Sequence, residues 1–438
     1  MNSNEHFNLL PGDAAVQLGL IAKVHGLEQA EIFFNSLPDE SKLIHIYGSL
    51  LNCYAEANAL DKAEAVMEKM KKFGFARTLS YNAMLKLYYK MGDHDKFNVL
   101  VQEMEAKGIF CDQFTNNIRL SAYSAASDMV EMEKLLMKME ADPLVSIDWF
   151  AYGIAADAYL KTGALKKATM VLKKFEHTIK AKSRSHAYRV LITLYTRLGR
   201  KDEVYRIWNK LKNSRNFYNS RYITVISSLV KLDDLDGAEK MLQEWQGEVK
   251  FFDGRVPYLL VSAYCQKGHM DKAESLISKL VEAGNEPNAS TWSCMVWGYC
   301  KSIQMEKAVD MLEKSIVTSE HRYHDVPTLS RCLEYLDSNG DAERAKKIIG
   351  LLEERGTFSI EFRDRLVNQI RKEKMGSKEF DEMEQEAVTL ETEEIFGDIE
   401  QEAETLRRNL WRHGARKAET LEAEESFGNM LFQRKTTS

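Results

Sequence analysis

The stretch TLSYNAMLKLYYKMGDHDKFNVLVQEMEAKGIFCD, residues 78–112, decides the fold, because reduced versions of it recur on both sides along the chain. Its apolar side chains at Met84, Leu87, Tyr88 and Met91 follow the i, i+3, i+4, i+7 spacing of a helix buried on one face. Gly92 can then end this helix in a left-handed conformation, which is open to glycine because it has no Cβ atom. A second helical segment follows at once, so the stretch predicts a helical hairpin.

A small residue in the second helix sets the whole chain in register. It is alanine at positions 63, 168, 238, 273, 308 and 345. Repeats then start near Pro11, Ile44, Thr78, Gln113, Trp149, Ser185, Asn219, Gly254, Ala289 and Val326. We therefore expect an extension at residues 1–10, about ten repeats of about 35 residues over 11–359, and a tail at 360–438. One hairpin cannot bury its apolar face alone, so the period predicts an all-α solenoid of stacked helix-turn-helix repeats.

Two further positions of the repeat carry a pattern. Position 11 is tyrosine in seven repeats, which indicates packing between helices: Tyr54, Tyr88, Tyr123, Tyr159, Tyr195, Tyr264 and Tyr299. Position 15 is often glycine, which predicts the left-handed end of the first helix: Gly92, Gly163, Gly199, Gly268 and Gly340.

Composition excludes several classes of protein. The chain of 438 residues is 44% hydrophobic and 29% charged, and no apolar run approaches the roughly 18–20 residues that span a bilayer. The six cysteines never lie two or three residues apart, so paired zinc or redox motifs are missing and we expect reduced, mostly buried thiols. The N-terminal residues resemble neither a signal peptide nor a transit peptide. We expect a soluble intracellular protein.

Two families of helical repeats share this length, and position 8 separates them. Tetratricopeptide repeats favour Gly or Ala there, whereas this chain has bulky apolar residues: Leu51, Leu85, Leu120, Ile192, Ile226, Val261 and Val296. The segments SYNAML, EMEAKGIFCD and LVEAGNEPN resemble the pentatricopeptide repeat instead. The resemblance covers about 350 residues, and, without a deaminase-like HxE and CxxC cluster, the chain is similar to the P class of plant organellar proteins. It implies a right-handed superhelical α-solenoid.

The resemblance also implies how such a protein would recognise single-stranded RNA. In this family the fifth and last residues of a repeat read one unpaired base, and the second residue stacks beside it. An Asn–Asp combination resembles the pair that favours uracil. Two consecutive repeats carry it, as Asn82 with Asp112 and as Asn117 with Asp148, with Leu79 and Phe114 in the stacking position. The alternative is that Asn and Asp serve only as turn and cap residues, where both are favoured.

Other repeats carry weaker signals. Ser293 with Asp325 resembles a weak guanine-type pair, although its second residue is the polar Ser290. Arg77, Arg184 and Arg189 stand at reading positions without a readable combination. These arginines are candidates for phosphate contacts, which add affinity without sequence information, or else are ordinary solvated surface.

The C-terminal segment differs from the repeats in charge. Residues 375–438 hold 16 acidic and 8 basic residues, which leaves 52 basic and 50 acidic residues before them. Within the tail, AVTLETEEIFG at 387–397 recurs as AETLEAEESFG at 418–428, identical at eight of eleven positions. The composition fits disorder, or a two-copy docking motif for a protein with Ile395, Phe396 and Phe427 as apolar anchors. Such segments would repel RNA.

The sequence points to binding and not to catalysis. It shows no glycine-rich phosphate loop, nucleophile elbow or metal-ligand pair, and His321 and His324 lack a third ligand. We expect no enzyme activity, cofactor or metal. The leading hypothesis is a monomeric protein that binds single-stranded RNA and acts in organellar transcript stabilisation, processing, splicing or translation. The alternative is a structural or assembly component of the organellar ribosome that binds ribosomal RNA or protein. By resemblance we favour the mitochondrion over the chloroplast.

Overall fold

The computed structural model describes residues 11–142, 145, 147–180, 184–212, 219–248, 251–318 and 326–354, which contain α-helices, one short 3-10 helix (Asp39–Ser41) and no strand. The first helices of the hairpins are α1 (Pro11–His25), α3 (Ile44–Glu56), α5 (Thr78–Met91), α7 (Gln113–Ala125), α9 (Trp149–Lys161), α11 (Arg184–Arg197), α13 (Asn219–Lys231), α15 (Arg255–Gln266), α17 (Ala289–Lys301) and α19 (Val326–Ser338). The second helices are α2 (Leu27–Ser36), α4 (Leu60–Lys72), α6 (His94–Ala106), α8 (Met129–Ala141), α10 (Leu165–His177), α12 (Lys201–Lys212), α14 (Leu235–Glu248), α16 (Met270–Glu282), α18 (Met305–Thr318) and α20 (Ala342–Glu354).

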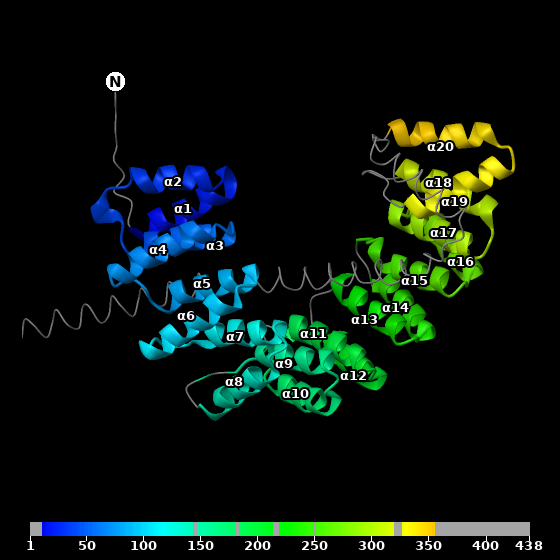
Figure 1. Ribbon diagram of the computed structural model, residues 1–438. Helices are drawn as coiled ribbons and strands as arrows, with labels where there is room; N and C mark the ends of the chain where they lie inside the picture. The colour runs from blue at the N-terminus through cyan, green and yellow to red at the C-terminus, as the bar shows by residue number, and fades with distance from the viewer. Residues whose placement is uncertain are drawn as a thin grey trace, which may run out of the picture. The chain divides into compact units, whose positions relative to one another are not determined.

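The hairpins stack in sequence order within two compact units, residues 1–241 and 242–438. In the first unit the first helix of each hairpin packs on the first helix of the next, from α1 through α13 (Figure 1). In the second unit α15 packs on α17 and α17 on α19. These contacts confirm the all-α repeat solenoid. None of the described helices is long and apolar enough to span a membrane.

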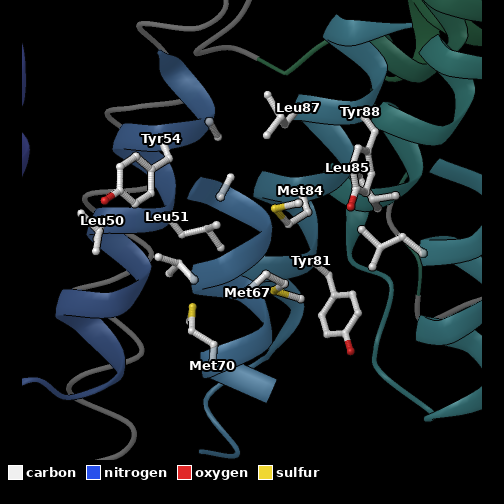
Figure 2. Close-up of a cluster of buried hydrophobic side chains, with 14 of the residues drawn as sticks. Leu50, Leu51, Tyr54, Met67, Met70, Tyr81, Met84, Leu85, Leu87 and Tyr88 are labelled. Carbon is white, nitrogen blue, oxygen red and sulfur yellow. The ribbon is translucent and has the colours of Figure 1, made fainter. Parts of the chain in front are cut away.

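The core runs continuously between neighbouring hairpins. Figure 2 shows Leu51 of α3, Met67 of α4 and Met84 of α5 in one cluster of buried side chains. Ala63, at the small position of α4, is fully buried. A larger side chain there would separate the two helices, because protein interiors are close-packed. The cluster extends through α7, so each hairpin is covered by its neighbours, as expected for a repeat that cannot bury its apolar face alone.

Six of the seven tyrosines at position 11 are buried and Tyr123 is half-buried, and several of the buried ones also join the hairpins by a polar contact. The Tyr88 hydroxyl donates to Oε1 of Glu64 in the preceding hairpin at 3.0 Å. Nζ of Lys96 donates to the same oxygen at 2.8 Å and lies over the Tyr88 ring. The arrangement recurs as Glu31–Tyr54–Lys62, Glu133–Tyr159–Lys167 and Glu274–Tyr299–Lys307. Burial and the neighbouring carboxylate both raise the pKa of Tyr88, so its hydroxyl keeps its proton.

Nine of the ten described hairpins turn through a residue with a left-handed backbone, and the hairpin of α1 and α2 turns at Gly26 with a φ of 87° and a ψ of 173°. The glycines predicted for position 15 all have a φ of 70–74°. Where the repeat has no glycine there, Asn58, Ser127, Asp233 and Ile303 take the same conformation, with φ between 54° and 60°. Asn and Asp tolerate this region, but a β-branched side chain does not. The repeat geometry therefore holds Ile303 in a strained conformation.

Ile303→Gly is expected to stabilise the protein by about 1 kcal/mol, because relief of the left-handed strain exceeds the added flexibility of the unfolded chain. The side chain of Ile303 is 83% exposed, so little packing is lost. The free energy of unfolding in urea measures the effect. Asn58→Gly is the matched control and should change stability by only a few tenths of a kcal/mol. A loss of stability in Ile303→Gly would show that this side chain contributes packing that its exposure does not reveal.

Candidate nucleic-acid interface

The last residue of each of the two repeats stands at the start of the next first helix. Asp112 is the N-cap of α7, where its Oδ1 accepts the backbone N–H of Thr115 at 2.7 Å. Asp148 caps α9 in the same way, accepting the N–H of Ala151 at 3.0 Å. Asp is favoured here because a free helical N–H needs an acceptor. Both aspartates therefore have the capping role that the sequence offered as the alternative to base reading. In each of them the cap uses Oδ1 and leaves Oδ2 for another contact.

The first Asn–Asp pair is closed into a network. Asn82, in the first turns of α5, is 2% exposed, and its Nδ2 lies 3.3 Å from Oδ1 of Asp112. Its Oδ1 lies 2.8 Å from the hydroxyl of Thr115. That hydroxyl is also 2.8 Å from Oδ1 of Asp112. The structure therefore brings Asn82 and Asp112 together, and adds Thr115 of the next repeat.

The second pair lacks this closure. Asn117 of α7 is 8% exposed, and its Oδ1 has no hydrogen-bond partner among the described residues. Residue 151, which stands where Thr115 stands in the repeat before, is an alanine and offers no hydroxyl. A buried amide oxygen without a donor is costly in a folded protein, and a bound ligand that supplies a donor would remove this cost.

The two stacking residues differ in exposure. Leu79, at the second position of α5, is 60% exposed and available to a base. Phe114, at the same position of α7, is half-buried and packs against the hydrophobic core. A planar face anchored on one side can still offer the other side to a base.

Of the third pair, Ser293 with Asp325, the structure describes only Ser293. The Ser293 hydroxyl hydrogen-bonds with that of Ser315 in α18 at 2.7 Å, so it is directed toward the second helix of its own repeat. Asp325 lies outside the described residues, as do Ile395, Phe396 and Phe427 of the tail and the histidines at 321 and 324. Within the described part of the chain, no group of three or more His, Cys, Asp or Glu residues could hold a metal ion.

The three candidate phosphate contacts also differ. Arg77, the residue before α5, and Arg184, the first residue of α11, are exposed. Arg189 is 8% exposed, because the fifth position of a first helix is covered by the neighbouring hairpin. Arg189 is therefore no more accessible than Asn117, which is also 8% exposed at the fifth position of its repeat. Of the three arginines, Arg77 and Arg184 are the exposed ones and the stronger candidates for phosphate contacts.

Thr115 is the member of this site that sequence reasoning missed. Its signal was a threonine three residues after an aspartate at a helix start, the arrangement of an N-cap with a polar residue at N3. A cap explains the backbone contact of Asp112 but not the contact of the Thr115 hydroxyl with Asn82, which lies 33 residues earlier.

Comparison with known proteins identifies the repeat. The family model described as PPR repeat matches residues 45–75, 79–109, 186–216, 222–248 and 290–316, and the PPR repeat family model matches 259–301. A mitochondrial pentatricopeptide repeat-containing protein of Arabidopsis thaliana is 43% identical over 364 residues, covering 82% of this chain and 74% of that protein. The large ribosomal subunit protein mL101 of Arabidopsis thaliana is 32% identical over 360 residues, 81% of this chain and 73% of that protein.

Solved structures show the same fold. The crystal structure of the pentatricopeptide repeat protein PPR10 in complex with an 18-nt psaJ RNA element has a TM-score of 0.53 at 20% identity. The match covers 71% of this chain but only 45% of the PPR10 chain. With repeat models along the chain and a relative at 43% identity, this protein belongs to the pentatricopeptide repeat family.

Proposed function

We propose that this protein binds single-stranded RNA in mitochondria and reads uracil-containing sequence with two neighbouring repeats. The observation that carries the proposal is the pair of buried Asn side chains, Asn82 and Asn117, each in a repeat whose last residue is an aspartate at a helix N-cap. An amide presents a donor and an acceptor together, which suits the Watson–Crick edge of an unstacked base. The described solenoid contains no metal cluster, and the proposed role is binding without a catalytic step.

Two features support RNA over a protein ligand. Arg77 and Arg184 are exposed near helix starts in the same row of first helices, where they can contact phosphates. The relative with 43% identity is named as mitochondrial, and PPR10 was crystallised with RNA. We expect a short readable footprint, because only two repeats carry the Asn–Asp combination.

Crosslinking followed by sequencing of the bound RNA tests this proposal. The expected result is a discrete transcript segment with neighbouring pyrimidines, at least one of them uracil. Binding in solution should also weaken as salt rises, because phosphate contacts release counterions. Recovery of no RNA above background would refute the proposal.

A second candidate function is a structural role in the mitochondrial ribosome. It is favoured by the 32% identity to the large ribosomal subunit protein mL101 over 81% of this chain. Under this proposal the bound RNA would be ribosomal and the base-reading pairs would matter little. Sedimentation after RNase digestion of messenger RNA separates the two functions: co-migration with the large subunit supports the structural role, and release from it supports the binding of a free transcript.

A further inference from the structure

The two Asn–Asp pairs differ at one residue of the following repeat. Position 3 of that repeat is Thr115 beside the first pair and Ala151 beside the second. Both residues are fully buried, and both give their backbone N–H to the capping aspartate. At this position the two sites therefore differ in the side-chain hydroxyl, as they also differ at the stacking position, which is Leu79 in the first and Phe114 in the second.

The hydroxyl of Thr115 has one proton and faces two acceptors. Oδ1 of Asp112 already faces the backbone N–H of Thr115 at 2.7 Å and Nδ2 of Asn82 at 3.3 Å. Oδ1 of Asn82 lies 2.8 Å from the hydroxyl and has no other donor that the contacts reveal. The proton is best placed toward Asn82, since the carboxylate oxygen is supplied by two N–H groups.

This network fixes the orientation of the Asn82 amide. An ionised carboxylate only accepts hydrogen bonds, so the amide end that faces Asp112 must be the NH2 group. The opposite end, which faces the threonine hydroxyl, is then the carbonyl oxygen. Turning the amide over would set its carbonyl against the carboxylate and its NH2 against the hydroxyl oxygen, so both contacts would have to rearrange.

The Asn117 amide has no such restraint. Its Oδ1 lacks a hydrogen-bond partner among the described residues, and Ala151 has no hydroxyl to supply one. The two ends of this amide are therefore free to exchange at little cost, which lets the side chain offer either a donor or an acceptor to a base.

Uracil and cytosine differ in whether their 4-position accepts or donates a hydrogen bond. Uracil carries an acceptor oxygen there and cytosine a donor amino group. An amide fixed in one orientation can satisfy one of them, whereas an amide that can turn over can satisfy both. We propose that the Thr115 hydroxyl is a positioning group that makes the first Asn–Asp pair selective for uracil over cytosine, while the second pair accepts either pyrimidine. This inference rests on the RNA binding proposed above.

Reciprocal substitutions test the proposal with a selection from a pool of random-sequence RNA. In the wild type, one of two neighbouring positions should show uracil over cytosine by about tenfold and the other by less than about threefold. Thr115→Val keeps the shape of the side chain without the hydroxyl and should reduce the larger ratio to about that of its neighbour. Thr115→Ser should restore it. Ala151→Ser should raise the smaller ratio several-fold, to about the larger one.

Two outcomes separate failure of this inference from failure of the proposed function. If the wild type enriches no RNA, the RNA-binding function is wrong. If it enriches uracil but Thr115→Val and Ala151→Ser both leave the uracil-to-cytosine ratios unchanged, the positioning role is wrong. Thermal unfolding of each variant guards against a folding defect, and a folded Ala151→Ser decides the matter even if Thr115→Val is unstable. A general weakening of binding with unchanged ratios would also contradict the proposal.

Discussion

A variant carrying both Asn82→Ala and Asn117→Ala is expected to bind the uracil-containing target RNA about a hundredfold more weakly than the wild type, with less than about a threefold change for unrelated RNA. Each single substitution removes the amide that would contact one base, and a well-placed base contact is worth about 1–3 kcal/mol. Binding to phosphates is independent of sequence and should remain. Titration of labelled RNA at constant salt gives both dissociation constants.

The control must be an Asn→Ala substitution at a repeat position that is not proposed to contact a base. Asn116→Ala provides it, because Asn116 is a buried asparagine of α7 next to Asn117 but at the fourth position of the repeat. We expect its effect on both RNAs to stay within about threefold. If the double variant loses as much affinity for unrelated RNA as for the target, the pairs do not read bases.

The helical hairpins could be predicted closely because several local signals agree. In the quoted stretch the apolar spacing, Gly92 and the second periodic segment place the helices that the structure has at Thr78–Met91 and His94–Ala106. The turn at Ile303 could not be predicted from that residue, because isoleucine disfavours a positive φ. There, stacking between neighbouring hairpins imposes the conformation against the local preference.

The candidate interface was accessible to sequence reasoning only in part. Repeat register alone places Asp112 at the start of α7 and Asn82 in the first turns of α5, since the last residue of a repeat precedes the next first helix. Register could not reveal that Arg189 is buried while Arg184 is exposed, because burial depends on how the neighbouring hairpin covers that position. Nor could it reveal the Thr115 hydroxyl as a partner of Asn82, which is a matter of side-chain geometry across two repeats.

Glu103→Ala is expected to destabilise the protein by about 2–3 kcal/mol, because one carboxylate of α6 serves three partners. The hydroxyl of Tyr81, a buried side chain of α5, donates to Oε1 of Glu103 at 2.8 Å. In Figure 2 this hydroxyl points away from Met67 and Met84. Nζ of Lys71 in the preceding hairpin donates to Oε2 at 2.9 Å, and Nζ of Lys107 to Oε1 at 2.7 Å. Removing the carboxylate leaves the Tyr81 hydroxyl without its acceptor and disconnects α4 from α6.

The pH dependence of stability isolates the charge of Glu103. Partial burial opposes ionisation, but hydrogen bonds from Lys107, Lys71 and Tyr81 outweigh it and lower the pKa of Glu103 to about 2. The unfolded chain binds this proton near its ordinary pKa, so the contribution is fully present above about pH 4.5 and is lost as pH falls toward 2. Because the carboxylate is partly open to solvent, we expect the contribution to be about 1–2 kcal/mol.

Glu103→Gln is the variant that measures this contribution, since its amide oxygen can still accept from Tyr81 but carries no charge. The difference in unfolding free energy between wild type and Glu103→Gln should be about 1–2 kcal/mol at pH 6 and should shrink steadily as the pH falls from 4.5 to 3. Urea unfolding at each pH gives this difference, and the titration of other carboxylates cancels because both proteins share them. A difference that is the same at pH 6 and pH 3 would mean that Glu103 has an ordinary pKa, and that its contacts with Lys71 and Lys107 contribute little to the stability of this hairpin pair.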